Sequence, residues 1–296
     1  MRVPAPAFRV TPMSAAAGSD AWTAASRAAA NAGVSLRRLT TLDDADLVLR
    51  LIEHTWGGQA LPRETLRALE HADSGVIGAE ADDGSLVGFV LGFLGTAGGL
   101  HVHSHMLAVV PDRRHGGVGF ALKLAQRAAA LDEGIDDVRW TYDPLLARNA
   151  WFNLMKLGAA ATEFLPDFYG EMDDLLNAND RSDRFEVRWR LRDAGVTARA
   201  AGDPAPLPGL EDATAVLECA GADGDVRPSL TGAAIGARAS VAIPRDYPEL
   251  RARDAALAAE WRSAAAEAFA KCFAAGLSAV ALTREAVYLF ADGQVT

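Results

Sequence analysis

Apolar positions along the chain recur with two different spacings, and these spacings predict an α/β fold. Short alternating or continuous apolar runs, typical of strands, occur at residues 36–39, 76–81, 86–94, 100–110, 138–142, 160–164 and 185–191. Apolar spacings of three and four, typical of helices, occur at residues 45–52, 63–71, 120–131 and 147–157. This order of elements predicts a mixed central sheet flanked by helices over residues 34–192.

The segments on either side of this region differ from it in composition. Residues 1–33 are Ala-rich, and we expect a partly disordered N-terminal extension without a signal peptide, with one short helix over 21–32. Residues 193–213 are rich in Ala, Gly and Pro and are interpreted as a linker. Residues 214–296 show a β-α-β-β pattern, which predicts a half-domain that extends the sheet or covers the substrate side rather than a second active site.

Composition narrows the choice of partners and compartment. Half of the 296 residues are hydrophobic, which is enough for a sizeable core, and the net charge of −10 argues against nucleic acid as a partner. An acidic surface favours a cationic or amine substrate instead. No stretch approaches the ~20 apolar residues of a membrane span, so we expect no membrane partner. The two cysteines lie far apart without a CxxC partner, which indicates a reduced, cytoplasmic protein.

One segment, Val109-Val-Pro-Asp-Arg-Arg-His-Gly-Gly-Val-Gly119, combines a strand end, a glycine-rich turn and a helix start. Backbone N–H groups point outward at a helix N-terminus, and the helix dipole there favours negative charge. Gly117 and Gly119 would let a phosphate approach closely. The segment contains neither a Walker motif nor a complete dinucleotide fingerprint. The alternative is that its glycines only form a tight turn between strand and helix.

The pattern Val109-x-Pro111-x-x-Arg114-x-x-Gly117-x-Gly119 resembles the pyrophosphate loop of the GNAT superfamily of acyl-CoA-dependent N-acyltransferases. The order of elements over residues 34–192 resembles the GNAT fold, and residues 149–158 match the family's second signature helix. Residues 169–189 resemble an uncharacterised bacterial subgroup of this superfamily. The resemblance implies acetyl-CoA or another acyl-CoA as co-substrate with no permanently bound cofactor, and an amine as acceptor. A homo-oligomer is compatible with it.

The same resemblance implies which residues hold the co-substrate. The backbone of Leu107, Ala108 and Val109 would hold the pantetheine arm and give a donor to the thioester oxygen. The loop and the second signature supply the remaining implied contacts: Arg114, His115, Gly116, Gly117, Val118, Gly119, Asn149 and Phe152. Asn149 could instead cap its helix.

The general base would come from the strand before the loop. His101, His103 and His105 alternate there, and His103 stands where some family members have a glutamate. A neutral imidazole could take the ammonium proton directly or through water. The alternatives are a core or surface histidine, a metal site formed by the three histidines, or Glu80 as the base.

The general acid departs from the family pattern. The family commonly has a tyrosine four residues before the glycine that ends the second signature helix, whereas this chain has Leu154. Tyr169 is the first substitute, Tyr142 the second, and the thiolate could also leave without an acid. We therefore predict an N-acyltransferase without a bound metal. The alternatives are a non-catalytic acyl-CoA-binding or regulatory module, and a metal-dependent enzyme that uses the histidines.

Overall fold

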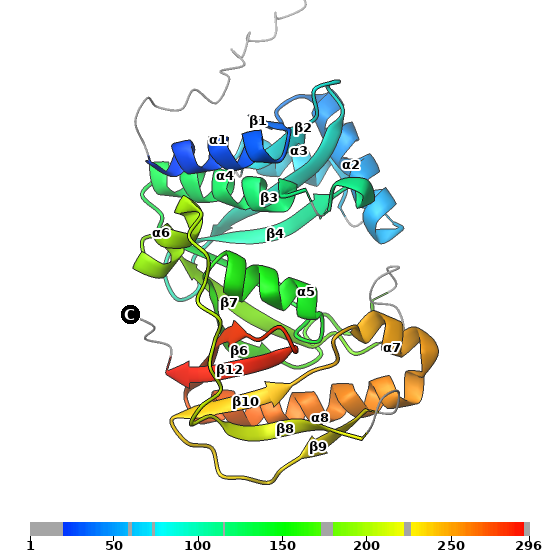
Figure 1. The fold of residues 1–296 in the computed structure, drawn as a ribbon. Helices are drawn as coiled ribbons and strands as arrows, with labels where there is room; N and C mark the ends of the chain where they lie inside the picture. The colour runs from blue at the N-terminus through cyan, green and yellow to red at the C-terminus, as the bar shows by residue number, and fades with distance from the viewer. Residues whose placement is uncertain are drawn as a thin grey trace, which may run out of the picture. The chain divides into compact units, whose positions relative to one another are not determined.

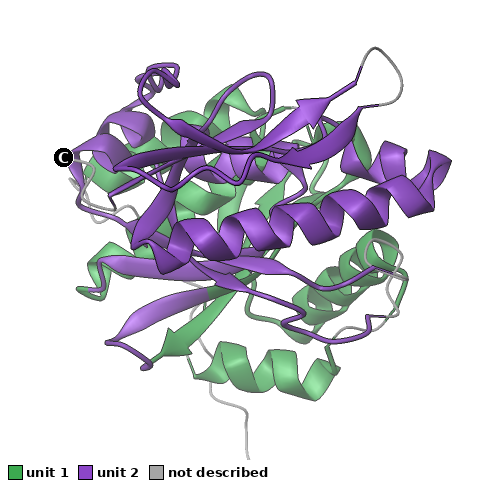
Figure 2. Ribbon diagram, turned by 90° about the horizontal axis from the view of Figure 1, so that it is seen from below, with its two compact units in different colours: residues 1–95, 104–134 green, residues 96–103, 135–296 purple. Residues whose placement is uncertain are grey.

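The computed structural model describes residues 20–58, 61–72, 75–114, 116–172, 180–221 and 226–292. The chain forms two compact units. Unit 1 comprises residues 1–95 and 104–134, and unit 2 comprises residues 96–103 and 135–296 (Figure 2).

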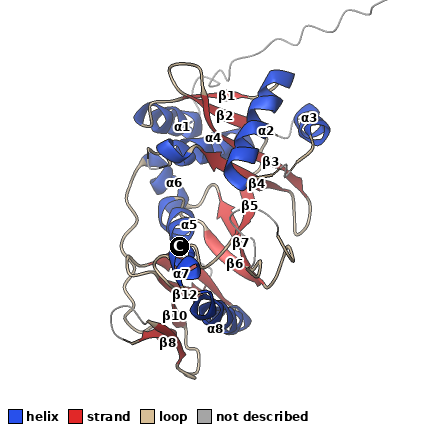
Figure 3. Cartoon of the chain, turned by 90° about the vertical axis from the view of Figure 1, so that its right-hand side faces the viewer, coloured by secondary structure: helices blue, strands red, loops and turns tan. Residues whose placement is uncertain are grey.

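Unit 1 is a sheet with helices on both faces. Its strands follow the order β1-β2-β3-β4, with β1 antiparallel to β2 and β2 antiparallel to β3. The strands are β1 (Ser35–Arg38), β2 (Val76–Glu80), β3 (Leu86–Gly95) and β4 (His101–Val109). The first three residues of β4 belong to unit 2. The helices are α1 (Asp20–Asn31), α2 (Leu42–Trp56), α3 (Arg63–His71) and α4 (Val118–Asp132) (Figure 3).

Alternation along β3 directs its side chains to two separate helix layers. Phe89 and Leu91 are buried in a core with residues of α2 and α3. Gly88 lies on the opposite face, where a Cβ would come within 3.2 Å of Leu122 on α4. Helix α1 covers α4, and the Trp22 indole donates to the Asp132 carboxylate at 2.6 Å.

Unit 2 has the strand order β5-β7-β6-β11-β12-β10-β8-β9. Neighbouring strands in this order are antiparallel, except that β8 and β10 are parallel. The start of β4 also pairs in parallel with β5, through Val102 with Val138 and His103 with Arg139. The strands are β5 (Asp137–Tyr142), β6 (Ala160–Leu165), β7 (Arg184–Arg190), β8 (Thr214–Ala220), β9 (Arg227–Leu230), β10 (Arg238–Ala242), β11 (Leu277–Leu282) and β12 (Val287–Asp292) (Figure 1).

The helices of unit 2 include one with an unusual turn. They are α5 (Ala147–Ala150), α6 (Ala194–Ala201), α7 (Tyr247–Arg253) and α8 (Ala255–Ala274). Helix α5 continues into a π-helical turn over Trp151–Lys156, and Gly158, with a φ of 72°, follows it. Such wide turns occur mostly as single insertions and often at functional sites.

Helix α8 packs onto the sheet through an aromatic cluster. Phe185 on β7 is fully buried and lies edge-on to Phe269 of α8, with ring centroids 4.6 Å apart. Tyr288 and Phe290 on β12 contact the same two rings. Segments more than 80 residues apart in the sequence therefore share one core.

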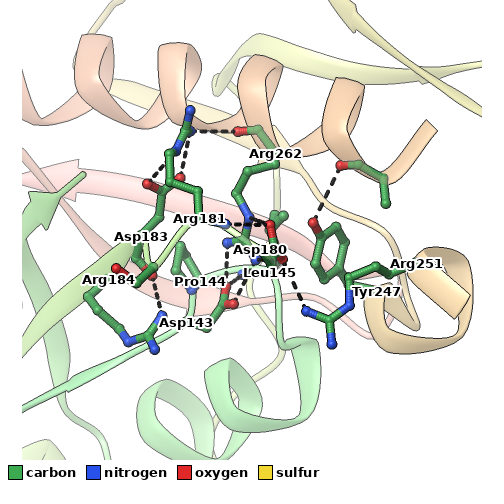
Figure 4. Close-up of polar contacts among 12 residues, drawn as sticks. Asp143, Pro144, Leu145, Asp180, Arg181, Asp183, Arg184, Tyr247, Arg251 and Arg262 are labelled. Atoms are coloured by element: carbon green, nitrogen blue, oxygen red, sulfur yellow. Dashed lines mark hydrogen bonds and ion pairs between the residues drawn. The ribbon is translucent and has the colours of Figure 1, made fainter. Parts of the chain in front are cut away.

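A buried cluster of charged side chains joins α8 to three other segments of unit 2 (Figure 4). Arg262 donates to Asp143 at 2.7 and 2.8 Å and to Asp180 at 2.6 and 3.3 Å. Its guanidinium also lies 4.7 Å from the centroid of the Tyr247 ring. The loop after β5, the segment before β7 and α7 are thereby tied to one side chain of α8.

The predicted fold class is confirmed, and the predicted strands and helices occur within a few residues of their expected bounds. The helix expected over residues 21–32 is α1, and the first 19 residues lie outside the described part of the chain. Helix α6, which lies within the expected linker, was not predicted from the sequence, and neither were α7, β8 and β9. Within the described ranges, no helix is both long and apolar enough to cross a membrane.

Candidate functional site

The glycine-rich segment connects β4 to α4 in unit 1. The Val110 N–H donates to Val87 at 2.9 Å, which keeps the chain on the sheet until Pro111. A 3-10 turn over Pro111–Arg113 follows, and the Gly116 N–H donates to the Arg113 carbonyl at 3.1 Å. Gly117 then starts α4 with φ 87° and ψ −3°, a left-handed conformation that glycine adopts without strain.

The start of α4 is suited to an anion. Gly117 occupies the N-cap position without any side-chain cap, and the Ala121 N–H makes the first helical bond to the Gly117 carbonyl at 3.0 Å. The N–H groups of the first turn are not used by the helix itself. Together with the helix dipole, they can bind a phosphate.

Gly119 differs from Gly117 in what it contributes. A Cβ at Gly119 would meet no atom closer than 3.8 Å, and its φ is not positive, so the fold tolerates a side chain here. The absence of a side chain at Gly119 instead leaves room for a ligand beside the N–H groups of the first turn. Val118, between the two glycines, is fully buried and anchors the helix, so only its N–H can face a ligand.

The remaining predicted loop residues have different environments. Arg114 is exposed, and its Nε donates to the Val109 carbonyl at 3.2 Å. Gly116 is exposed as well. His115 lies outside the described residues.

Strand β4 changes its side-chain alternation before the loop. Ser104 contacts Lys123 on α4, and Leu107 and Val109 also lie beside α4, each 3.8 Å from a Cβ at Gly119. Strict alternation would place residues 104 and 107 on opposite faces. One extra residue between them, as in a β-bulge, accounts for the change. The change of face falls between Ser104 and Leu107, so it comes just before the backbone of Leu107 and Ala108.

Close approach of β3 to β4 depends on a glycine that the sequence analysis did not identify. A Cβ at Gly88 would lie 2.9 Å from the carbonyl oxygen of Ala108, and the backbone would have to move. A glycine inside a strand was the available signal, because such glycines often mark close backbone approach.

The three histidines of β4 have separate environments. His101 is buried, with Nδ1 2.8 Å from the Gly99 carbonyl oxygen. His103 is half-buried. His105 is more exposed, lies 5.7 Å from the Phe93 ring, and has a pKa lowered by partial desolvation. Among the described residues, no group of three or more His, Cys, Asp or Glu could hold a metal ion.

Glu80, the alternative base, belongs to an ion-pair network in unit 1. Its carboxylate accepts from Arg37 at 2.7 Å, and Arg37 also donates to Asp44 at 2.6 Å. Burial alone would raise the pKa of Asp44, but hydrogen bonds from Arg37 and Thr41 outweigh it and lower that pKa to about 2. Glu80 therefore helps to fix β1 and the start of α2.

The two candidate acids in unit 2 are not equivalent. Tyr169 is 44% exposed, and its hydroxyl lies 3.1 Å from Thr141 Oγ1. The Arg184 guanidinium lies 5.3 Å from its ring centroid. Tyr142 is buried beside the Tyr288 hydroxyl, and burial raises its pKa. Tyr169 is the one that solvent or a ligand can reach.

Asn149 and Phe152 lie on the helix that becomes π-helical. Asn149 is exposed in α5 and does not cap it, because Leu146 holds the N-cap position without a side-chain bond. Phe152 is half-buried in the π-helical turn, and Leu154, where the family commonly has a tyrosine, is buried. No sequence signal indicated the π-helical turn.

A buried amine on α4, the helix that follows the loop, was also not predicted. Lys123 on α4 is 2% exposed, and its Nζ donates to Ser104 at 2.7 Å and to Gln126 at 3.1 Å. Burial lowers its pKa to about 7. The signal was present, because Lys123 is the single ionisable residue between Val118 and Gln126.

Residues 36–152 match the family model described as "Acetyltransferase (GNAT) family". Among curated proteins, none matches the chain. Similar solved structures include Naa20 from Chaetomium thermophilum with a bisubstrate analogue, at 20% identity and a TM-score of 0.44 over 53% of this chain and 86% of that one. The ribosomal-protein-S18-alanine N-acetyltransferase from Escherichia coli is similar at 15% identity and a TM-score of 0.44, over 54% of this chain and 96% of that one. The yncA protein from Salmonella typhimurium with acetyl-CoA is similar at 15% identity and a TM-score of 0.43, over 54% and 95%.

Proposed function

Because residues 36–152 match the family model of GNAT acetyltransferases, we propose that this protein transfers an acyl group, acetyl by default, from coenzyme A to an amine by direct attack. We assign the reaction to residues 34–192, with 193–213 as a linker and 214–296 as a structural half-domain. We place the protein in the cytoplasm, with an amine on a small molecule or peptide as acceptor.

One observation carries the proposal: α4 begins at Gly117 in a left-handed conformation, with no side chain capping its first turn. These N–H groups would bind the pyrophosphate of CoA, with Arg114 at the edge of the loop. The pantetheine arm would follow the backbone of Leu107, Ala108 and Val109, which comes after the change of alternation in β4.

The chemistry assigns a role to each remaining candidate. The amine nitrogen must be neutral to attack the thioester carbonyl carbon, so His103 would accept the ammonium proton directly or through water. The C–N bond forms as the carbonyl becomes an oxyanion, which the Leu107 or Ala108 N–H would stabilise. The C–S bond then breaks, and the CoA thiolate takes a proton for which Tyr169 is the proposed donor. The nitrogen, now bonded to the acyl carbon, loses its second proton, which restores Tyr169, while the proton taken by His103 goes to solvent. The products are an amide, free CoA and one proton released to solvent.

Asn149 and Phe152, on α5 and its π-helical turn, would contact the pantetheine arm. Glu80 is the second choice as base, because it is held in an ion pair with Arg37.

The burial of Leu154 favours a second candidate function, a non-catalytic acyl-CoA-binding module, because that position supplies no acid. The test is calorimetric titration with acetyl-CoA, longer acyl-CoAs and free CoA, followed by thiol-release assays against a panel of amines. Binding that is lost in Gly117→Glu supports the phosphate loop. No binding of any CoA species would refute both candidates.

Kinetics of two variants separate the candidates. We expect His103→Ala and Tyr169→Phe to lose turnover and retain acetyl-CoA binding, while His54→Ala, an exposed histidine on α2, keeps both. Wild-type protein that binds acetyl-CoA and acylates no amine would instead identify a binding module.

A further inference from the structure

The parallel strands β8 and β10 of unit 2 pair only over part of their length. The pairs run from Ala239 with Thr214 to Val241 with Leu217, with a register shift before the last pair. Beyond it, β8 continues to Ala220 and pairs with β9 on its other side. The carboxyl ends of the two parallel strands therefore separate. Ligands of open α/β sheets commonly bind in crevices at this end of parallel strands.

A cavity of about 840 Å³ lies where the strands separate. Trp261 of α8 lines it, and so does Ser240 of β10. Tyr288 faces α8 and pairs with Val241, so the next residue along, Ser240, points to the opposite face of the sheet. Residues that point to both faces of the sheet therefore line the cavity, which lies at the ends of the two strands. Its size falls within the range typical of small-molecule sites.

The walls are largely apolar and include one hydroxyl group. Leu217, Ile243, Leu250 and Trp261 are buried side chains of the lining. The Trp261 N–H already donates to the Val226 carbonyl at 3.1 Å. Ser240 lines the cavity and is 7% exposed. Its hydroxyl can donate a hydrogen bond to a bound molecule or accept one from it.

Acidic groups outnumber basic ones around this cavity. The charged lining residues are four carboxylates and two guanidinium groups: Glu218, Asp246, Glu249, Glu285, Arg245 and Arg253. Asp246 accepts from the Glu249 N–H and caps α7. The other five side chains form no ion pair with any described residue, whereas Arg262, elsewhere in the same unit, is paired twice. The excess of negative charge favours a cationic ligand.

We propose that this cavity is a second ligand site, which binds a small molecule with an apolar body and a protonated amine. The apolar part would lie between β8 and β10 against Trp261, with Ser240 as a hydrogen-bonding partner. The ammonium group would lie among the rim carboxylates. The site is separate in sequence from the loop of residues 109–119 and does not depend on the proposed acyl transfer.

The test compares ligands that share an apolar body and differ in charge. Tryptamine and phenethylamine are titrated calorimetrically into the full-length protein beside indole-3-propionate and 3-phenylpropionate. We expect the amines to bind at least tenfold more tightly than the acids. Acids that bind as tightly as the amines, or amines that fail to bind at millimolar concentration, would overturn the proposal.

Protection of a cysteine from alkylation tests whether the amine binds in this cavity. Cys219 lines the cavity and is exposed, while Cys272 is buried. Partial burial raises the pKa of the Cys219 thiol, against a smaller opposing effect of Arg245, so labelling is done at mildly alkaline pH. The amine should slow alkylation of Cys219 in proportion to occupancy. Calorimetric binding without protection of Cys219 would place the ligand elsewhere and refute the site.

Removing an acidic or a basic group at the rim should change the affinity for the amine in opposite directions. We expect Glu249→Gln to weaken tryptamine binding about fivefold and Arg245→Gln to strengthen it by a similar factor, since each removes one charge at the rim. Glu64→Gln, an exposed carboxylate of α3 in unit 1, is the matched control and should change nothing. Ala215→Phe adds bulk to the lining and should abolish binding. Titration of every variant with CoA shows separately whether the phosphate loop is intact.

Discussion

Replacing Arg262 with methionine should strongly destabilise the protein. The arginine side chain is 4% exposed and makes four hydrogen bonds to two carboxylates, Asp143 and Asp180. Methionine keeps much of the apolar stem and removes the charge, so both carboxylates lose their buried cation. Removing one partner of a buried ion pair costs about 3–5 kcal/mol, because the remaining charge is left uncompensated. We expect a loss of this size in the free energy of unfolding at pH 7.

The pH dependence of that loss identifies its cause. Burial alone would raise the pKa of Asp180, but hydrogen bonds and charge from Arg262 outweigh it and lower that pKa below its usual 3.8. A lowered carboxyl pKa gives stability that is present above the unfolded value and lost as the pH falls. Without Arg262, the carboxyl loses the largest of these favourable contributions, while Arg251 still pairs with it at 3.4 Å. The deficit of the variant should therefore shrink as the pH falls from about 4 through the lowered pKa of Asp180.

Urea unfolding followed by circular dichroism measures both effects. Arg227→Met is the matched control, because Arg227 forms an exposed pair with Glu260 on the same helix α8. It should cost less than about 1 kcal/mol. A loss below about 1 kcal/mol for Arg262→Met at pH 7, or a deficit that stays constant from pH 7 to about pH 2, would refute the account of a buried ion pair.

Four further substitutions test the first unit. Gly117→Ala should weaken CoA binding and also lower the free energy of unfolding by about 1–2 kcal/mol, because residue 117 has a positive φ. Gly119→Ala should weaken CoA binding at little cost in stability. Equal changes in the melting temperature of the two variants would contradict this. Burial lowers the pKa of Lys123 to about 7, so wild-type stability should rise with pH from about 7 towards 10.5, and Lys123→Met should remove the rise in denaturation curves. Asp44→Asn should cost about 2 kcal/mol at neutral pH, a difference that disappears as the pH falls from about 4 to 2; a cost that persists at pH 2 would contradict the assignment.

Much of the fold could be predicted from the sequence because its elements follow simple periodic patterns. The strand before the loop and helix α4 are continuous apolar or amphipathic segments with a glycine between them, so local residues decide their structure. Strand β9 was missed because it contains Pro228, which is rare inside strands. Helix α7 was missed because it has only seven residues and Pro248 in its first turn.

The candidate site was predictable only where it is local. The loop from Val109 to Gly119 is one continuous segment, so spacing and glycines identify it. The partners of Arg262 lie 119 and 82 residues away, and no periodic pattern relates residues at such distances. The same applies to the proposed cavity, which depends on where two parallel strands stop pairing.

The pairing of β6 with β11 bears on where this chain could be shortened. A protein truncated after residue 192 would leave β6 with an open edge and Phe185 without the rings of Phe269 and Tyr288. Exposed strand edges and aromatic surfaces promote aggregation. Residues 34–192 expressed alone should therefore aggregate, and a soluble fragment must retain α8, β11 and β12.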